Sequence, residues 1–171
     1  MKIGLIVEGD SDKDFFEKYF KPNFKRDIIV TSPGKKGICK ILNREKIHQD
    51  IKALFARGCK EVHILIDLDT QCDRGKKFTC IVELKKWYRK KVSLETKDNV
   101  AVTIVSKEIE AWMLSAWENS NNKSKQDLEK HFKTKKSLNE KELLKKFIDS
   151  RRSIDRVKNA SLDYFFIKIG L

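Results

Sequence analysis

The chain alternates short apolar runs with longer amphipathic segments. Each run is four to six residues long and contains no Asp, Glu, Lys or Arg, which is typical of strands buried on both faces of a parallel sheet. The four runs lie at residues 3–7, 28–31, 62–66 and 100–105. The segments that follow them carry apolar residues at three- and four-residue spacing, which predicts helices.

The first predicted helix is clearly marked at both ends. Ser11 and Asp12 are typical N-cap residues. Phe15 and Tyr19 lie one turn apart, and Pro22 is expected to end the helix because it has no backbone N–H to donate. Further helices are predicted over 38–55, over 78–92 and from 109 onward. Strand and helix thus alternate four times, which predicts an α/β fold with a parallel sheet of about four strands and right-handed crossovers.

This α/β core is expected to span residues 1–118. Residues 119–125 are rich in Asn, Ser and Lys and are interpreted as a polar linker. The remainder, 126–171, is expected to form a basic helical extension packed on the core, with Ser137 and Glu140 as a capping box and Ser161 as a later N-cap. The helices predicted there are 126–132, 139–149, 151–158 and 162–169.

Composition and charge narrow the class of protein. Fifty of the 171 residues are Leu, Ile, Val or Phe, which is enough for a packed core. Lys and Arg outnumber Asp and Glu by 38 to 25, so the net charge of +13 favours nucleic acid or another polyanion as partner. No run is long enough for a transmembrane helix, and the apolar N-terminal stretch is too short for a signal peptide, so we expect a cytoplasmic protein without a membrane partner.

The four cysteines do not form a metal-binding or redox motif. Their spacing contains no Cys-x-x-Cys, and no His is placed to complete a zinc site. We interpret them as reduced thiols, although spacing alone leaves a disulfide pair open. The cysteines are Cys39, Cys59, Cys72 and Cys80.

Acidic residues follow three of the four predicted strands. The carboxyl ends of parallel strands meet at one edge of a sheet, where ligands of open α/β sheets bind, so these carboxylates are expected to converge. Crowded carboxylates repel one another unless a cation lies among them, and Mg²⁺ or Mn²⁺, as one or two ions, fits this donor type. The candidate metal ligands are Glu8, Asp12, Asp67, Asp69, Glu108 and Glu110.

Two of these carboxylates have competing interpretations. Asp12 lies at the expected start of a helix, where an acid equally well caps the helix or stabilises its dipole. Glu110 lies about 200° from Glu108 around a helix, so the two converge on one site only if the helix begins late. Glu8 and Asp67 end strongly apolar strands, and a convergent set of such acids is harder to explain by solvation alone.

Three segments carry a resemblance to a known family. They are Glu8-Gly9-Asp10-Ser11-Asp12, Asp67-Leu68-Asp69 and Ser106-Lys107-Glu108-Ile109-Glu110-Ala111-Trp112. In this order and strand context, residues 2–118 resemble a Toprim domain, and within it the nucleases of the overcoming-lysogenization-defect group and small stand-alone Toprim-like proteins. The resemblance implies that Glu8, Asp67 and Asp69 hold Mg²⁺ and that Glu8 is a general acid or base.

Departures from the larger Toprim families narrow the expected activity. The 53 residues after the core are too few for the DNA-gate domain of a topoisomerase, and the chain lacks the Cys and His set of a primase zinc domain. It also lacks a phosphate-binding Gly-x-x-x-x-Gly-Lys-Ser/Thr loop, so an associated ATPase would be a separate chain. The expected function is a Mg²⁺-dependent nuclease acting on DNA or RNA, in a phage-defence or DNA-repair system.

Other segments are candidates for binding the substrate phosphates. Residues 34–37 precede a predicted helix and offer backbone N–H groups and positive charge, although an ordinary turn would look the same. Lys107 is a candidate catalytic residue that would stabilise charge on the scissile phosphate. The candidate phosphate-binding residues are Gly34, Lys35, Lys36 and Gly37, and the candidate backbone contacts are Arg151, Arg152 and Arg156, with the basic segment 85–91 in a similar role.

Three other functions remain as alternatives. A haloacid-dehalogenase-type phosphatase also has Asp-x-Asp after a strand, but it expects Thr or Val where Gln71 stands. A receiver-like module expects paired acids after the first strand, where Gly9 interrupts the pair. The remaining alternative is a catalytically silent Toprim-like subunit that binds nucleic acid or serves as a scaffold in a defence complex.

Overall fold

The computed structural model describes residues 1–33, 41–68, 80–94, 98–133 and 137–171. Asp69 and the predicted phosphate-binding residues Gly34, Lys35, Lys36 and Gly37 lie outside the described residues, as do Cys39 and Cys72. The chain divides into two compact units, residues 1–104 and 105–171. The second unit therefore takes in the segment that follows the last strand as well as the C-terminal helices.

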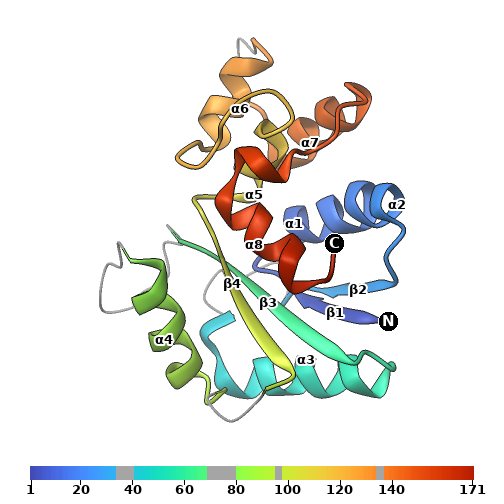
Figure 1. The fold of residues 1–171 in the computed structure, drawn as a ribbon, viewed down its shortest axis with the longest axis vertical. Helices are drawn as coiled ribbons and strands as arrows, with labels where there is room; N and C mark the ends of the chain where they lie inside the picture. The colour runs from blue at the N-terminus through green and yellow to red at the C-terminus, as the bar shows by residue number, and fades with distance from the viewer. Residues whose placement is uncertain (34–40, 69–79, 95–97, 134–136) are drawn as a thin grey trace. The chain divides into compact units, whose positions relative to one another are not determined.

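The first unit is built on a four-stranded parallel sheet, which confirms the predicted α/β fold (Figure 1). Its strands are β1 (Ile3–Ile6), β2 (Ile28–Thr31), β3 (Glu61–Asp67) and β4 (Val100–Val105). They lie in the order β2-β1-β3-β4, and β1 is paired in parallel with both β2 and β3. All four match the apolar runs to within one residue at each end.

The strand order reverses direction between β1 and β3. From β1 the chain moves to β2 on one side, then crosses back to β3 and β4 on the other. In doubly wound sheets this reversal leaves a crevice outside the carboxyl ends of the two central strands. Ligand-binding residues are therefore expected directly after Ile6 and Ile66.

Helices connect these strands on both faces of the sheet. In Figure 1, α3 runs along the opposite side of the sheet from α1 and α2. The helical segments of the first unit are α1 (Asp10–Phe15), η1 (Phe16–Phe20), α2 (Lys21–Phe24), α3 (Arg44–Ala56) and α4 (Ile81–Lys91).

The prediction that Pro22 ends the first helix is wrong. The chain continues as helix to Phe24 because η1 is a π-helical segment, in which the Lys21 N–H bonds to the Phe16 carbonyl. Pro22 then falls in the first turn of α2, where its missing N–H is tolerated. The Asn23 side chain donates to the Tyr19 carbonyl at 2.7 Å, so the widened turn keeps that acceptor satisfied.

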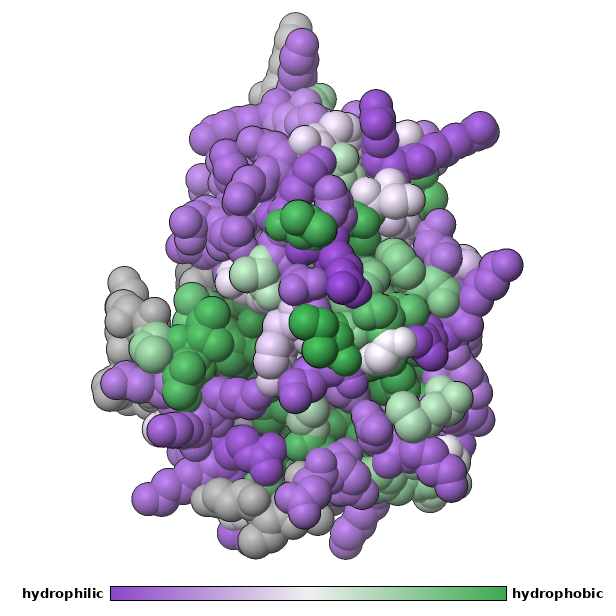
Figure 2. Space-filling view, in the orientation of Figure 1, coloured by the Kyte–Doolittle hydropathy of each residue, from purple (hydrophilic) through white to green (hydrophobic). Residues whose placement is uncertain are grey.

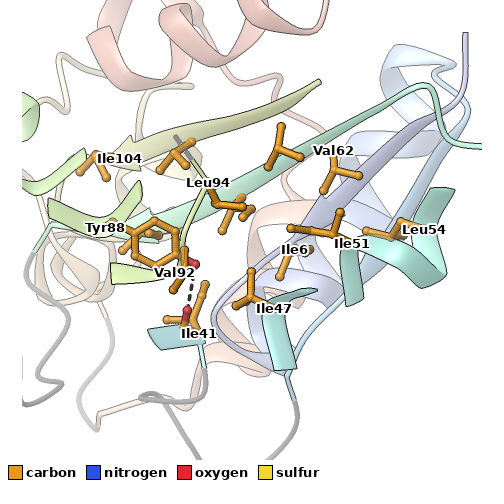
Figure 3. Close-up of a cluster of buried hydrophobic side chains, with 14 of the residues drawn as sticks. Ile6, Ile41, Ile47, Ile51, Leu54, Val62, Tyr88, Val92, Leu94 and Ile104 are labelled. Carbon is orange, nitrogen blue, oxygen red and sulfur yellow. Dashed lines mark hydrogen bonds between the residues drawn. The ribbon is translucent and has the colours of Figure 1, made fainter. Parts of the chain in front are cut away.

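A hydrophobic cluster joins α3 and α4 to one face of the sheet (Figure 3). Alternate residues of β3, Val62, Ile64 and Ile66, point into it, as expected for a strand whose side chains alternate between faces. Tyr88 of α4 is fully buried there, and its hydroxyl donates to the Ile41 carbonyl at 2.8 Å. Burial raises the pKa of Tyr88, and the negative charge of Glu8 acts in the same direction.

Helix α3 approaches β1 closely at Gly4. A Cβ atom at this position would lie 2.9 Å from Leu54 Cδ1 and 3.1 Å from Leu54 Cβ. These distances are shorter than van der Waals contact, so the glycine allows the backbone of β1 to pack directly beneath Leu54.

The second unit is helical, as predicted for the C-terminal part. Its elements are α5 (Ile109–Leu114), α6 (Lys125–His131), α7 (Glu140–Asp149), η3 (Arg156–Lys158) and α8 (Ala160–Lys168). A helix over 151–158 was expected, but only the 3₁₀ turn η3 is helical there. Arg151 adopts a left-handed backbone with φ of 53° directly after α7, which breaks the helical path.

Asparagines, rather than the predicted serines, cap two of these helices. Asn139 caps α7, its side chain accepting from the Glu142 N–H, while Ser137 instead donates to Glu129. Asn159 caps α8 by accepting from the N–H groups of Ser161 and Leu162, so this helix begins two residues before the predicted start. Both corrections arise because an Asn close to the predicted serine has the better capping geometry.

The two cysteines among the described residues are both free thiols. Cys59 is buried and Cys80 is exposed. Burial raises the pKa of Cys59, and this effect outweighs the neighbouring positive charges of Lys2 and Arg57, which lower it. Cys59 is therefore a poor nucleophile in the folded protein.

The surface is mostly hydrophilic in the view of Figure 2, with smaller hydrophobic areas between charged side chains. The large hydrophobic residues that are exposed include Val82 of α4 and Ile167 of α8. Among the residues that the structure describes, none of the helices is long and apolar enough to cross a membrane.

Candidate active site at the carboxyl ends of the central strands

Glu8 and Asp67 meet at the reversal point of the sheet. Glu8 follows β1, and its Oε1 atom accepts a hydrogen bond from the Asp67 backbone N–H at 3.0 Å. Both residues are partly exposed. The bond places Glu8 beside the backbone of Asp67, and the convergence of the two carboxylates stays a prediction.

The parallel register of the central strands brings the pair together. Ile3 is aligned with Glu61 and Ile6 with Ile64, so two residues beyond Ile6 the chain reaches the level of Ile66 and Asp67. The N–H of Val7 bonds to the Thr31 carbonyl at 3.0 Å, which holds the end of β1 against β2 as well. Glu8 is thus fixed from both sides before the chain turns into α1.

Asp12 caps the helix that follows. Its Oδ2 atom accepts from the Gly9 N–H at 3.0 Å, and Gly9, the N-cap residue of α1, has an extended backbone. This is the reciprocal half of a capping box, and it is one of the two roles that the sequence left open for Asp12. The capping bond ties the acid to the turn directly after Glu8.

Sequence reasoning did not single out a further contact at this edge. Ser32, directly after β2, donates from its hydroxyl to Asp10 Oδ1 at 2.8 Å. The bond joins the loop after β2 to the first turn of α1, and therefore stabilises two segments close to Glu8 in the fold. A serine following an apolar run is too common to predict such a contact, because 22 residues separate the partners.

The acids after β4 belong to the second unit. Glu108 is the N-cap residue of α5 and has an extended backbone, so the helix does begin late, as convergence of Glu108 and Glu110 would require. The Glu108 Oε2 atom accepts from the Lys125 N–H at 2.8 Å, at the start of α6. Glu110 is buried in the first turn of α5.

Lys107 lies in a fixed turn directly before Glu108. Its backbone is left-handed, with φ of 68°, which is uncommon for a residue other than glycine. On one side, the Ser106 N–H donates to Ser161 Oγ at 3.1 Å, and on the other, Glu108 bonds to Lys125. The turn that carries the candidate catalytic lysine is therefore held at both ends.

Ser161 is the centre of a buried polar network that supports this turn. Its hydroxyl also accepts from Trp112 Nε1 at 2.9 Å and donates to Asn159 Oδ1 at 2.8 Å. The Asn159 amide in turn donates to Ser120 Oγ at 3.0 Å. Each of these buried polar groups thus has a partner, which makes the turn between β4 and α5 a well-specified structure.

The three candidate backbone-binding arginines have different environments. Arg151 and Arg152 are exposed after α7. Arg156 forms an ion pair with Asp163, with Nε 3.0 Å from Oδ1, and donates to the Leu171 carbonyl at 2.7 Å. A phosphate would therefore compete with an existing carboxylate for Arg156.

The candidate metal centre in the first unit is the pair Glu8 and Asp67. Within the described ranges, no group of three or more His, Cys, Asp and Glu side chains is arranged to hold a metal ion, and Asp69 lies outside those ranges. Two carboxylates are nevertheless a suitable set for Mg²⁺, which is usually bound by one or two carboxylates together with water and phosphate oxygens. The donor type at the strand ends therefore fits this ion.

Comparison with known proteins identifies a family. The family model that matches residues 7–159 is described as a domain of unknown function, DUF4276. The chain belongs to this family. The DUF4276 match covers Glu8 and Asp67 in the first unit and Lys107 and Glu108 in the second. No curated protein and no solved structure matches the chain, and the Toprim resemblance stays a hypothesis.

Proposed function

We propose that this DUF4276 protein is a Mg²⁺-dependent nuclease that hydrolyses phosphodiester bonds of DNA or RNA. The observation that carries the proposal is the hydrogen bond between Glu8 Oε1 and the Asp67 N–H at the reversal point of the sheet. It brings the Glu8 carboxylate to the backbone of Asp67 at the edge where open α/β sheets bind ligands. The net charge of +13 supports a polyanionic substrate.

The chain's own residues supply distinct parts of the chemistry. Asp67 and Glu8 would hold the ion, with Asp69 as a further ligand two residues after Asp67. Bound Mg²⁺ supplies a positive charge that polarises the phosphate and favours ionisation of water. Glu8 is rigidly placed, so its carboxylate is suited to accept or return a proton during hydrolysis.

Cleavage assays with a matched control test this proposal. Supercoiled plasmid, linear DNA and structured RNA would each be incubated with the purified chain in Mg²⁺, Mn²⁺ or EDTA. We expect metal-dependent cleavage of at least one substrate by wild type and its loss in Asp67→Asn. Asp98→Asn is the control, because Asp98 is exposed and precedes β4 at the opposite edge of the sheet. Equal cleavage by all three proteins would reject the site.

A catalytically silent nucleic-acid-binding subunit is the second candidate. It is favoured by a specific observation: three of the candidate carboxylates already accept backbone hydrogen bonds, Glu8 from Asp67, Asp12 from Gly9 and Glu108 from Lys125. In this case the protein would bind nucleic acid, in the cytoplasm, as part of a defence complex with a separate ATPase. Binding without cleavage of any substrate would support this candidate over the nuclease.

A further inference from the structure

Helix α4 is the most basic helix of the described structure. Residues 81–91 contain five Lys or Arg side chains and one acid, Glu83, which gives a net charge of +4. The other described helices have net charges between −2 and +2. Helix α4 therefore carries +4 of the net charge of +8 of the first unit.

Three lysines of α4 are exposed and unpaired among the described residues. Lys86, Lys90 and Lys91 are exposed, and none of the ion pairs or side-chain hydrogen bonds among the described residues involves them. Some lysines elsewhere form ion pairs along their helices, as Lys18 does with Asp14 and Lys46 with Asp50. Lys86, Lys90 and Lys91 have no such partner among the described residues, and repulsion between like charges lowers the stability of the helix.

Complementing the helix dipole accounts for Lys90 and Lys91, in the last turn of α4, but not for Lys86. The Arg89 guanidinium donates to the carbonyls of Leu94 and Val100, beyond the end of the helix. Lys86 lies in the middle of the helix, more than one turn before its end, where the dipole has little effect. A cationic surface that the helix dipole explains only in part is expected to serve an anionic partner.

The geometry points to α4 as the surface on which this protein binds the phosphate backbone of nucleic acid, with Lys86, Lys90 and Lys91 contacting phosphates. Lys86 and Lys90 are one turn apart, roughly 6 Å along the helix axis, and lie on one face of α4, so both can reach the same phosphate backbone. The inference rests on the proposed function in taking nucleic acid as the partner. It adds the place where that partner is held.

The salt dependence of DNA binding tests this surface. Binding of a short fluorescent DNA duplex would be measured in EDTA at several salt concentrations. The variant Lys86→Gln, Lys90→Gln, Lys91→Gln is expected to lower the magnitude of the slope of log affinity against log salt by up to about 2.7, because each lost phosphate contact removes about 0.9. Lys90→Gln alone, with a change of about 0.9, serves if the triple variant folds poorly.

Helix α7 provides the matched control. Lys141, Lys145 and Lys146 are also exposed, but they share their helix with three acids, which brings its net charge to zero. Changing all three to Gln removes the same charge from the chain and should alter the slope by less than half as much. Equal changes in both variants, or no change in the α4 variant, would overturn the surface.

The remaining outcomes separate this inference from the proposed function. DNA binding through α4 without cleavage of any substrate would reject the nuclease and leave the surface in place. Mg²⁺-dependent cleavage with an unchanged salt slope in the α4 variant would support the nuclease and overturn the α4 surface. Absence of DNA binding by wild type, or α4-dependent binding to phosphatidylserine vesicles in place of DNA, would also overturn the assignment of this surface to nucleic acid.

Discussion

Glu8 combines a structural role with a proposed chemical one. Its carboxylate accepts the Asp67 N–H at the point where β1 and β3 end, so it holds the turn after β3 in place. The same negative charge is what the proposed Mg²⁺ site needs. Because an amide oxygen also accepts hydrogen bonds, substitution can separate the two roles.

We expect Glu8→Gln and Glu8→Ala to behave differently. The glutamine keeps an acceptor for the Asp67 N–H, so its free energy of unfolding without metal should stay within about 0.5 kcal/mol of wild type. The alanine leaves that partly buried N–H without its acceptor and should cost about 1–3 kcal/mol. Both should lose stabilisation by Mg²⁺. Denaturant unfolding with and without Mg²⁺ measures these free energies, and Glu17→Ala is the exposed control. Equal losses of unfolding free energy in the two Glu8 variants without metal would contradict the structural role.

Among the elements, β1 and α3 depend on one close contact. The position of α3 over β1 requires that residue 4 has no side chain, since a Cβ atom there would lie 2.9 Å from Leu54 Cδ1. Leu54 is itself fully buried in the cluster of α3, α4 and the sheet (Figure 3). This contact therefore sets how closely the helix covers the central strand.

Gly4→Ala is expected to destabilise the protein by about 1–3 kcal/mol through overpacking against Leu54. Leu54→Ala alone should also destabilise, by about 2–5 kcal/mol, because it leaves a cavity. The double variant should lose less than the sum of the two, since the shorter side chain makes room for the new Cβ. Strict additivity in denaturant melts would show that the cost of Gly4→Ala does not arise from its contact with Leu54.

Helix α6 should be sensitive to acid through its cap. The Asp127 carboxylate accepts from the Ser124 N–H at 2.9 Å, and mainly this bond lowers the pKa of Asp127 below its ordinary value of 3.8. A lowered pKa in the folded state stabilises the protein above pH 3.8, and the contribution is lost as pH falls through the folded value. Asp127→Asn should therefore melt below wild type at neutral pH, and the gap should close in acid. A gap independent of pH would contradict this.

The positions of the four strands along the chain could be predicted, because the apolar runs that form buried parallel strands are a strong local signal. Helix ends were harder, since Asn159 competes with Ser161 as a cap and only the local backbone decides between them. The proximity of Glu8 to the backbone of Asp67 could be predicted, because the two residues lie at the carboxyl ends of predicted parallel strands. The bond from the Lys125 N–H to Glu108 did not, because it depends on how α6 returns to α5.

At the scale of the whole molecule, the two units contain different candidate functional residues. The first unit has the sheet, the pair Glu8 and Asp67, and the basic helix α4. The second has the fixed turn at Lys107 and the network around Ser161. The DUF4276 match extends over both units.

The central claim, that Glu8 and Asp67 form a metal site, is tested most directly by thermal melts of wild type, Asp67→Asn and Asp98→Asn in EDTA and in millimolar Mg²⁺. Mg²⁺ that binds only the folded state should stabilise wild type and Asp98→Asn by about 2.7 kcal/mol at one hundred times Kd. Asp67→Asn should melt higher than wild type in EDTA, because carboxylate repulsion is relieved, and should gain little from Mg²⁺. Equal melting points and equal responses to Mg²⁺ in all three proteins would contradict the claim.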